Sequence, residues 1–104
     1  MDRSEMKRRV CEAIDRHREE IIGLGRAIRG TPELGFKEHK TAAEVAKTFA
    51  AHGIPYQEKL AITGVKGILA GAADGPTIGI LGELDSLLCA DSPYADKSTN
   101  AAHT

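Results

Sequence analysis

The chain has 104 residues, of which 41% are hydrophobic and 28% charged, and its formal net charge at pH 7 is −1. This length allows one domain, near the lower limit for a self-sufficient core. The balanced charge argues against a nucleic-acid or anionic membrane partner, and no apolar run approaches the roughly 20 residues of a membrane span.

The first predicted element is a long helix over residues 4–29. Its apolar residues recur at helical spacing, and Gly30 followed by Thr31-Pro32 is a strong stop signal because proline disfavours helical geometry in the residue before it. The apolar face comprises Met6, Val10, Ile14, Ile21, Leu24 and Ile28. A helix of this length, about 39 Å at roughly 1.5 Å per residue, suggests a larger body to pack against.

The rest of the chain alternates turns with short elements. A turn over residues 31–36 leads to a second predicted helix, which ends before Gly53. Three strands follow, and the last leads into a polar loop. We predict the helix at residues 37–52, the strands at residues 56–60, 65–70 and 77–84, and the loop at residues 85–104.

This order of elements predicts an α/β fold, with two helices followed by a three-stranded mixed sheet. The six residues between the second and third strands are too few for a helical crossover. Those two strands should therefore be antiparallel if they are neighbours.

Two acidic residues, Glu83 and Asp85, stand at the carboxyl end of the third predicted strand. Side chains alternate along a strand, so both carboxylates should point to the same side. Ligands commonly bind beyond the carboxyl ends of strands in open α/β sheets, and paired acids repel each other unless a cation or a shared proton intervenes. The alternative is a solvated strand end without a ligand.

The remaining reactive side chains are mostly predicted to lie on the surface. This applies to His17, His39 and His52, whereas His103 follows the acidic pair at the end of the polar loop. The cysteines, Cys11 and Cys89, form no Cys-x-x-Cys pair and are predicted to be free thiols in a reducing cytosol. The basic amino terminus lacks the apolar core of a secretory signal, so we expect a cytoplasmic protein.

Several segments, taken together, resemble one family of enzymes. They are Thr31-Pro32-Glu33-Leu34-Gly35-Phe36, Glu38 with Lys40-Thr41-Ala42, Thr63-Gly64-Val65, Gly75 to Gly79, Gly82-Glu83-Leu84-Asp85, and Ala95-Asp96 through Ala101-Ala102-His103. The chain thereby resembles the N-terminal part of a metal-dependent amidohydrolase of the aminoacylase and carboxypeptidase-like superfamily. The closest branch hydrolyses N-acyl-amino acids, indole-acetyl-amino acids and p-aminobenzoyl-glutamate.

The resemblance implies a zinc-peptidase-like α/β/α catalytic domain, of which this chain is the N-terminal portion. It implies hydrolysis of the amide bond of a small-molecule N-acyl or N-aroyl amino acid by water activated at zinc or manganese in the full-length parent. It is compatible with a homodimer of that parent, and it leaves the acyl group, the amino acid and the metal open.

The resemblance also assigns roles to three residues. Asp85 matches an aspartate that supports the metal site, while Glu83 and His103 are site-proximal. In this branch His103 would begin a His-x-Cys-Gly-His motif, with Thr104 at the spacer. No metal ligand is expected within this chain, because the ligating cysteine and histidine of the motif would follow Thr104.

We therefore expect an incomplete catalytic domain that is inactive in isolation. The alternative is a complete small binding or interaction module, or a non-catalytic subunit.

Overall fold

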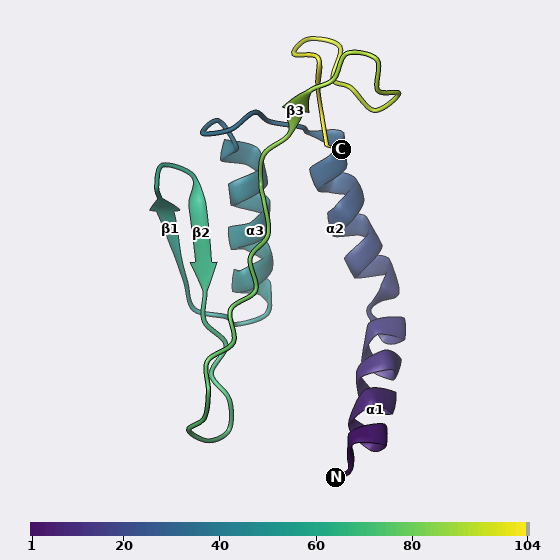
Figure 1. Cartoon of the computed structure of the whole chain (residues 1–104), viewed down its shortest axis with the longest axis vertical. Helices are drawn as coiled ribbons and strands as arrows, with labels where there is room; N and C mark the ends of the chain where they lie inside the picture. Colours follow the sequence, from purple (N-terminus) through teal and green to yellow (C-terminus); the bar gives the residue numbers. More distant parts are fainter. Residues whose placement is uncertain (104) are drawn as a thin grey trace.

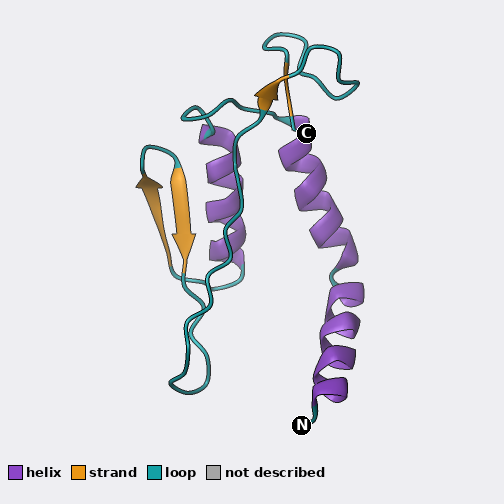
Figure 2. Ribbon diagram, viewed as in Figure 1, coloured by secondary structure: helices purple, strands orange, loops and turns teal. Residues whose placement is uncertain are grey.

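Helices occupy the first half of the chain and short strands the second half in the computed structural model, which describes residues 1–103 (Figures 1 and 2). The helices are α1 (Arg3–Arg16), α2 (Arg18–Gly30) and α3 (His39–Ala51). The strands are β1 (Tyr56–Leu60), β2 (Gly64–Gly67), β3 (Leu87–Leu88) and β4 (Ala101–Ala102). In the described residues, β1 pairs only with β2 and β3 only with β4, both antiparallel.

The single helix predicted over residues 4–29 is wrong, because the chain breaks into α1 and α2 at His17. The His17 backbone has a ψ of 12°, and its N–H is shared between the carbonyls of Ala13 and Ile14. Beyond the break, a Glu20 carboxylate oxygen lies 2.6 Å from Nε2 of His52, at the end of α3. This contact joins α2 to α3, whereas α1 projects away from the rest of the molecule (Figure 1).

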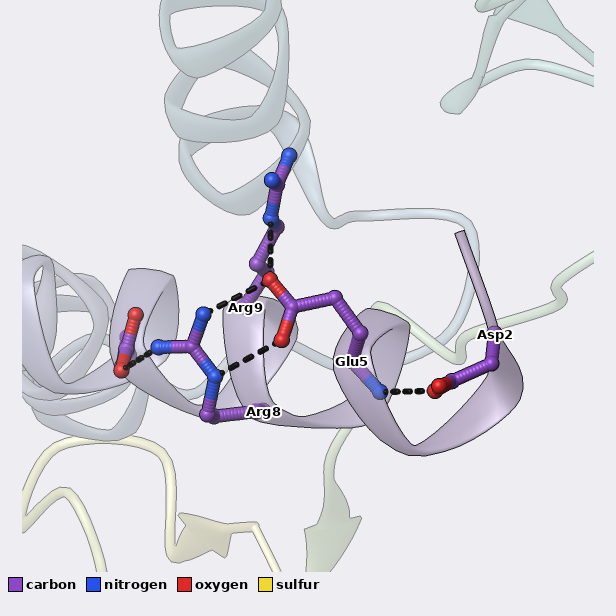
Figure 3. Close-up of polar contacts among 5 residues, drawn as sticks. Asp2, Glu5, Arg8 and Arg9 are labelled. Carbon is purple, nitrogen blue, oxygen red and sulfur yellow. Dashed lines mark hydrogen bonds and ion pairs between the residues drawn. The ribbon is translucent and has the colours of Figure 1, made fainter.

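Local polar contacts stabilise the projecting helix α1. Asp2 caps its amino terminus by accepting a 2.8 Å hydrogen bond from the Glu5 N–H, and the Glu5 carboxylate accepts from Arg8 and Arg9 (Figure 3). Capping satisfies a backbone donor that has no partner inside the helix. Exposed ion pairs of this kind add little stability. Helix α1 thus forms from local signals, and none of its residues is buried.

Helix α3 and the β1–β2 hairpin form the best-packed part of the molecule. Helix α3 and strand β1 lie where the sequence predicts them, within two residues at each end. The rings of Phe49 and Tyr56 are 6.3 Å apart between centroids. A Cβ atom at Gly67 would lie 3.0 Å from the Phe49 ring, so a larger residue here would force the ring or the strand to shift.

The predicted three-stranded mixed sheet is not formed, and the prediction of a strand at residues 77–84 is wrong. This segment is extended, but no residue within it makes a backbone hydrogen bond to any described residue. Strand β2 ends at Gly67, so the second strand is shorter than the predicted residues 65–70, although the Ile68 N–H still donates to the Pro55 carbonyl at 3.1 Å. The predicted loop, in contrast, contains β3 and β4 within its described part, residues 85–103. Pairing requires a neighbouring strand, which residues 77–84 lack here.

Little apolar surface is buried among the described residues. The buried hydrophobic residues are Ala46, Ala101 and Ala102, whereas Ile80 and Leu81 are 97% and 98% exposed. The radius of gyration is 16.4 Å, against about 13 Å for a compact chain of this length. The accessible surface is 8533 Å², about half as much again as a compact monomer of 11.1 kDa exposes. The fold is therefore open. Its helices and strands are formed, but few apolar side chains are packed between them.

We expect Gly67→Ala to destabilise the α3–hairpin unit by about 1–3 kcal/mol, because the added methyl group forces the Phe49 ring to move. Urea denaturation followed by far-UV circular dichroism measures the change. The matched control is Gly25→Ala in α2, where no atom lies within 4 Å of the new methyl group. Alanine favours helix by about 1 kcal/mol over glycine, so this control should be neutral or stabilising. Equal midpoints for Gly67→Ala and the unmodified chain would contradict the packing argument.

Candidate functional site

The end of the extended segment is fixed at Ser86, the residue that follows Asp85. The Ser86 N–H and hydroxyl donate to the backbone carbonyl of Glu33, at 2.7 and 2.8 Å. Ser86 also forms an isolated parallel bridge with Leu34, and it is only 3% exposed. This contact joins the turn after α2 to the end of the extended segment, 53 residues later in the sequence.

The side chain of Glu33 caps helix α3. Its carboxylate accepts hydrogen bonds from the N–H groups of Lys40 and Thr41, at 3.1 and 2.7 Å, and from the Thr41 hydroxyl at 2.8 Å. These N–H groups lie in the first turn of α3, where backbone donors have no partner within the helix. A negative charge there also interacts favourably with the helix dipole. Glu33 thus connects α3 to Ser86, through its side chain and its carbonyl respectively.

A second glutamate, Glu38, connects the start of α3 to the β1–β2 hairpin. Its carboxylate accepts a 2.5 Å hydrogen bond from the Thr63 hydroxyl and a 3.0 Å hydrogen bond from the Phe36 N–H. Glu38 and Thr63 are both buried, at 6% and 8% exposure. The Phe36 backbone adopts a φ of 62°, which non-glycine residues rarely do. The bond from its N–H to Glu38 contributes to holding this tight turn.

The β3–β4 pair places His103 beside the acidic strand end. Leu87 lies opposite Ala102 in the register, so the next positions outward are Ser86 and His103. Atom Nε2 of His103 is buried and has no hydrogen-bond partner in the described part of the chain. Thr104, which the resemblance assigns to the spacer of the metal motif, lies outside the described residues.

Of the three predicted site residues, the structure brings Asp85 and His103 to the same end of the β3–β4 pair. Glu83 lies two residues earlier in the unpaired segment. Both carboxylates are exposed, and neither accepts a hydrogen bond from a described residue. The shared direction predicted for the Glu83 and Asp85 carboxylates stays a prediction. So do the roles that the resemblance assigns to Glu83, Asp85 and His103. His17, His39 and His52 are exposed, as expected, and both cysteines are free thiols.

The described residues do not fit a resident zinc or manganese ion. Within residues 1–103, no three histidine, cysteine, aspartate or glutamate side chains lie close enough together to hold a metal ion. A protein zinc site uses three or four such side chains. Asp85 and His103 could therefore stand beside a metal centre but could not form one from this part of the chain alone.

A pocket of about 360 Å³ is lined in part by the Glu33 turn. Its lining also includes Lys37 and Lys40, and Asp96 and Thr99 from the segment before β4. The Asp96 carboxylate is occupied by hydrogen bonds from Ser98 and Thr99, which lower its pKa. None of the three predicted site residues lines this pocket, so the pocket and the acidic strand end are separate features.

Sequence patterns did not identify the roles of Glu33, Glu38 and Ser86. The available signal was Pro32-Glu33 shortly before a predicted helix, which is compatible with a capping carboxylate. The partners Thr63 and Ser86 lie 25 and 53 residues away from the groups they contact, so no local spacing could reveal them.

Comparison with known proteins identifies several relatives. The chain is 30% identical over 106 residues to YhaA of Bacillus subtilis (strain 168), whose name places it among the amidohydrolases; the match covers 99% of this chain and 27% of YhaA. It is 31% identical over 87 residues to the N-acetyl-L-cysteine deacetylase of the same organism, covering 81% of this chain and 21% of that protein. It is 35% identical over 79 residues to the hippurate hydrolase of Campylobacter jejuni, covering 73% of this chain and 21% of that protein.

These matches cover most of this chain but only a small part of each relative. The chain spans about a quarter of the length of the curated relatives it matches. No family model matches the chain, and no solved structure does. No helix in residues 1–103 is long and apolar enough to cross a membrane.

We expect Glu33→Ala to weaken the start of α3, because the N–H groups of Lys40 and Thr41 lose their acceptor. Loss of a capping side chain costs about 1 kcal/mol. Amide hydrogen exchange should accelerate at Lys40 and Thr41. Glu58→Ala on β1, an exposed glutamate without a described hydrogen bond, is the matched control and should leave these amides unchanged. Unchanged exchange in Glu33→Ala would contradict the capping role.

Acid should weaken the Glu33 and Glu38 contacts. Burial alone would raise the pKa of Glu33, but the hydrogen bonds from Thr41 and Lys40 outweigh it and lower that pKa. The Thr63 hydroxyl lowers the pKa of Glu38. A carboxylate with a lowered pKa contributes stability that is complete above its ordinary value of 4.5 and is lost as the pH falls through the lowered value.

Thermal unfolding measured from pH 6 down to pH 3 should show this loss below pH 4.5. The double variant Glu33→Gln/Glu38→Gln should be less stable at pH 6 and less sensitive to pH. The same pH dependence in the double variant and in the unmodified chain would contradict the assignment to these two carboxylates.

Proposed function

Since this chain is a distant homologue, over part of their length, of the aminoacylase and carboxypeptidase-like amidohydrolases, we propose that it forms the N-terminal part of a catalytic domain that hydrolyses amide bonds. The substrate class is N-acyl or N-aroyl amino acids, which are small molecules, and the location is the cytoplasm. Neither nucleic acid nor a membrane takes part.

The observation that carries this proposal is the agreement among the names of the relatives. One is named for N-acetyl-L-cysteine, one for hippurate and two for IAA-amino acids. Each of these compounds joins an acyl group to an amino acid through an amide bond. This shared chemistry supports an N-acyl amino acid as the substrate and leaves the particular acyl group undefined.

The described residues contribute one wall of the proposed site. The backbone bonds from Ser86 to the Glu33 carbonyl hold the end of the segment that bears Asp85. The register of β3 and β4 holds His103 at the same end. In this proposal Asp85 is a positioning residue beside a zinc or manganese centre whose ligands come from outside residues 1–103, and Glu83 lies near that centre.

We expect the 104-residue chain alone, with added zinc or manganese, to release no amino acid from N-acetyl-L-cysteine or hippurate above the uncatalysed rate. Too few candidate ligands gather in its described residues to hold a metal ion. Product release followed by amino-acid chromatography is the measurement. Turnover at an enzymatic rate would favour a complete module and contradict this part of the proposal.

A chimaera tests the proposed function directly. This chain replaces the matching stretch of the Bacillus N-acetyl-L-cysteine deacetylase, and hydrolysis of N-acetyl-L-cysteine is measured. We expect the chimaera to be active, and Asp85→Ala within it to lower kcat/KM by about 10–100-fold, as for residues that orient metal ligands. Asp74→Ala, in the exposed turn at residues 71–76, is the matched control.

A folded chimaera without activity would overturn the proposed function. Equal activity of Asp85→Ala and Asp74→Ala would overturn the role of Asp85 alone.

A further inference from the structure

The loop between β3 and β4 is organised around one residue, Asp96. Its carboxylate accepts hydrogen bonds from the N–H groups of Ser98 and Thr99, at 2.9 and 3.1 Å, and from the hydroxyl groups of the same two residues. An aspartate that accepts from the backbone two and three residues further on closes a turn by itself. The side chain of Asp96 therefore orders the turn at residues 96–99.

The backbone of Asp96 connects this turn to β4. Its N–H donates to the Ala101 carbonyl at 2.9 Å, and its carbonyl accepts from the Asn100 N–H at 2.7 Å. Asn100 has a φ of 59°, a left-handed conformation that asparagine tolerates better than most residues. The Asn100 carbonyl in turn accepts from the N–H of Cys89, just after β3, at 2.7 Å. These bonds return the chain to the side of β3 and start β4 at Ala101.

The position of His103 depends on this register. The residue directly follows β4, and its Nε2 atom is buried without a hydrogen-bond partner in residues 1–103. The place of the ring therefore follows from the backbone of β4, because no bond at that nitrogen fixes it among these residues. A slip of one residue in the pairing would turn His103 to the opposite face. Ala101 and Ala102 are both 0% exposed, so a shift of β4 would also disturb its packing.

We propose that Asp96 is a positioning residue of the candidate site, which sets the place of His103 beside Asp85 by fixing the register of β4. The proposal rests on the proposed function for what the site does, but not for the contacts of Asp96. The Glu33 turn holds the Asp85 side of the wall through Ser86, and Asp96 holds the His103 side. Asp96 acts through the backbone, so it is not a catalytic residue.

The first test follows His103 in the 104-residue chain by nuclear magnetic resonance at one fixed pH. We expect Asp96→Ala to change the chemical shifts of the His103 ring and to remove the nuclear Overhauser contacts between Leu87 and Ala102. Amide exchange at Asn100 should accelerate by about tenfold or more, because its acceptor is no longer held in place. The matched control is Asp91→Ala, an aspartate of the same loop that accepts a hydrogen bond only from the Cys89 thiol among the described residues.

Two further variants separate positioning from charge and from folding. Asp96→Asn keeps a side-chain oxygen that accepts from the N–H groups of Ser98 and Thr99, so it should restore the signals of the unmodified chain. Asp96→Glu keeps the charge but misplaces the carboxylate, so it should behave like Asp96→Ala. Amide exchange in α3 is the folding reference and should stay the same. If it accelerates in Asp96→Ala, the contrast between Asp96→Asn and Asp96→Glu decides the question.

The second test measures hydrolysis of N-acetyl-L-cysteine by the chimaera with the Bacillus deacetylase. We expect Asp96→Ala to lower kcat by about tenfold with KM unchanged, and Asp96→Asn to restore it. The double variant Asp85→Ala/Asp96→Ala should lose less than the product of the two single losses, because residues that act on one site are not additive. Asp91→Ala should retain full activity.

Unchanged His103 signals in Asp96→Ala would overturn the proposal. So would rescue by Asp96→Glu instead of Asp96→Asn, because the effect would then belong to the charge. An active chimaera in which Asp96→Ala keeps its full kcat would overturn the role in the site, even where the His103 signals move. An inactive chimaera would count against the proposed function, and the His103 signals would still decide the role of Asp96.

Discussion

The residue on which the arrangement of this chain most depends is Glu33. Its carboxylate satisfies the unpaired N–H groups at the start of α3, and its carbonyl accepts both hydrogen bonds from Ser86. Two segments separated by 53 residues are thereby joined at one point. Buried polar groups are costly unless they are hydrogen-bonded, so the 3% exposure of Ser86 makes this junction specific.

The same junction determines where a site can form. Asp85 precedes Ser86, and the short β3–β4 pair places His103 at the same end. Glu38 provides a second connection, from the start of α3 to Thr63 before β2. Hydrogen bonds around the turn at residues 31–38 therefore hold the wall of the proposed site. The apolar side chains that usually pack behind such a wall are largely exposed.

Sequence patterns predicted the elements that depend on local interactions. The helix ending before Gly53 and the strand at residues 56–60 were predicted well because stop signals and periodicity act within a few residues. Sequence patterns missed the helix break at His17, because the step from Ile14 to Ile21 keeps the helical spacing of the apolar residues across it. The strand at residues 77–84 was wrong because alternation shows what a segment does beside a partner strand, not whether that partner is present.

For the site, sequence patterns identified candidate residues but not their supports. Asp85 and His103 were placed at a strand end and at a loop end, and β3–β4 pairing brings these two ends together. The contacts of Glu33 and Glu38 cross 53 and 25 residues respectively, beyond the reach of any local pattern. Burying a side chain such as Ile80 or Leu81 yields about 1.5–3 kcal/mol, which this open chain has not gained. The Glu33 junction does not involve those side chains, so the position of Asp85 can be set before the apolar faces are covered.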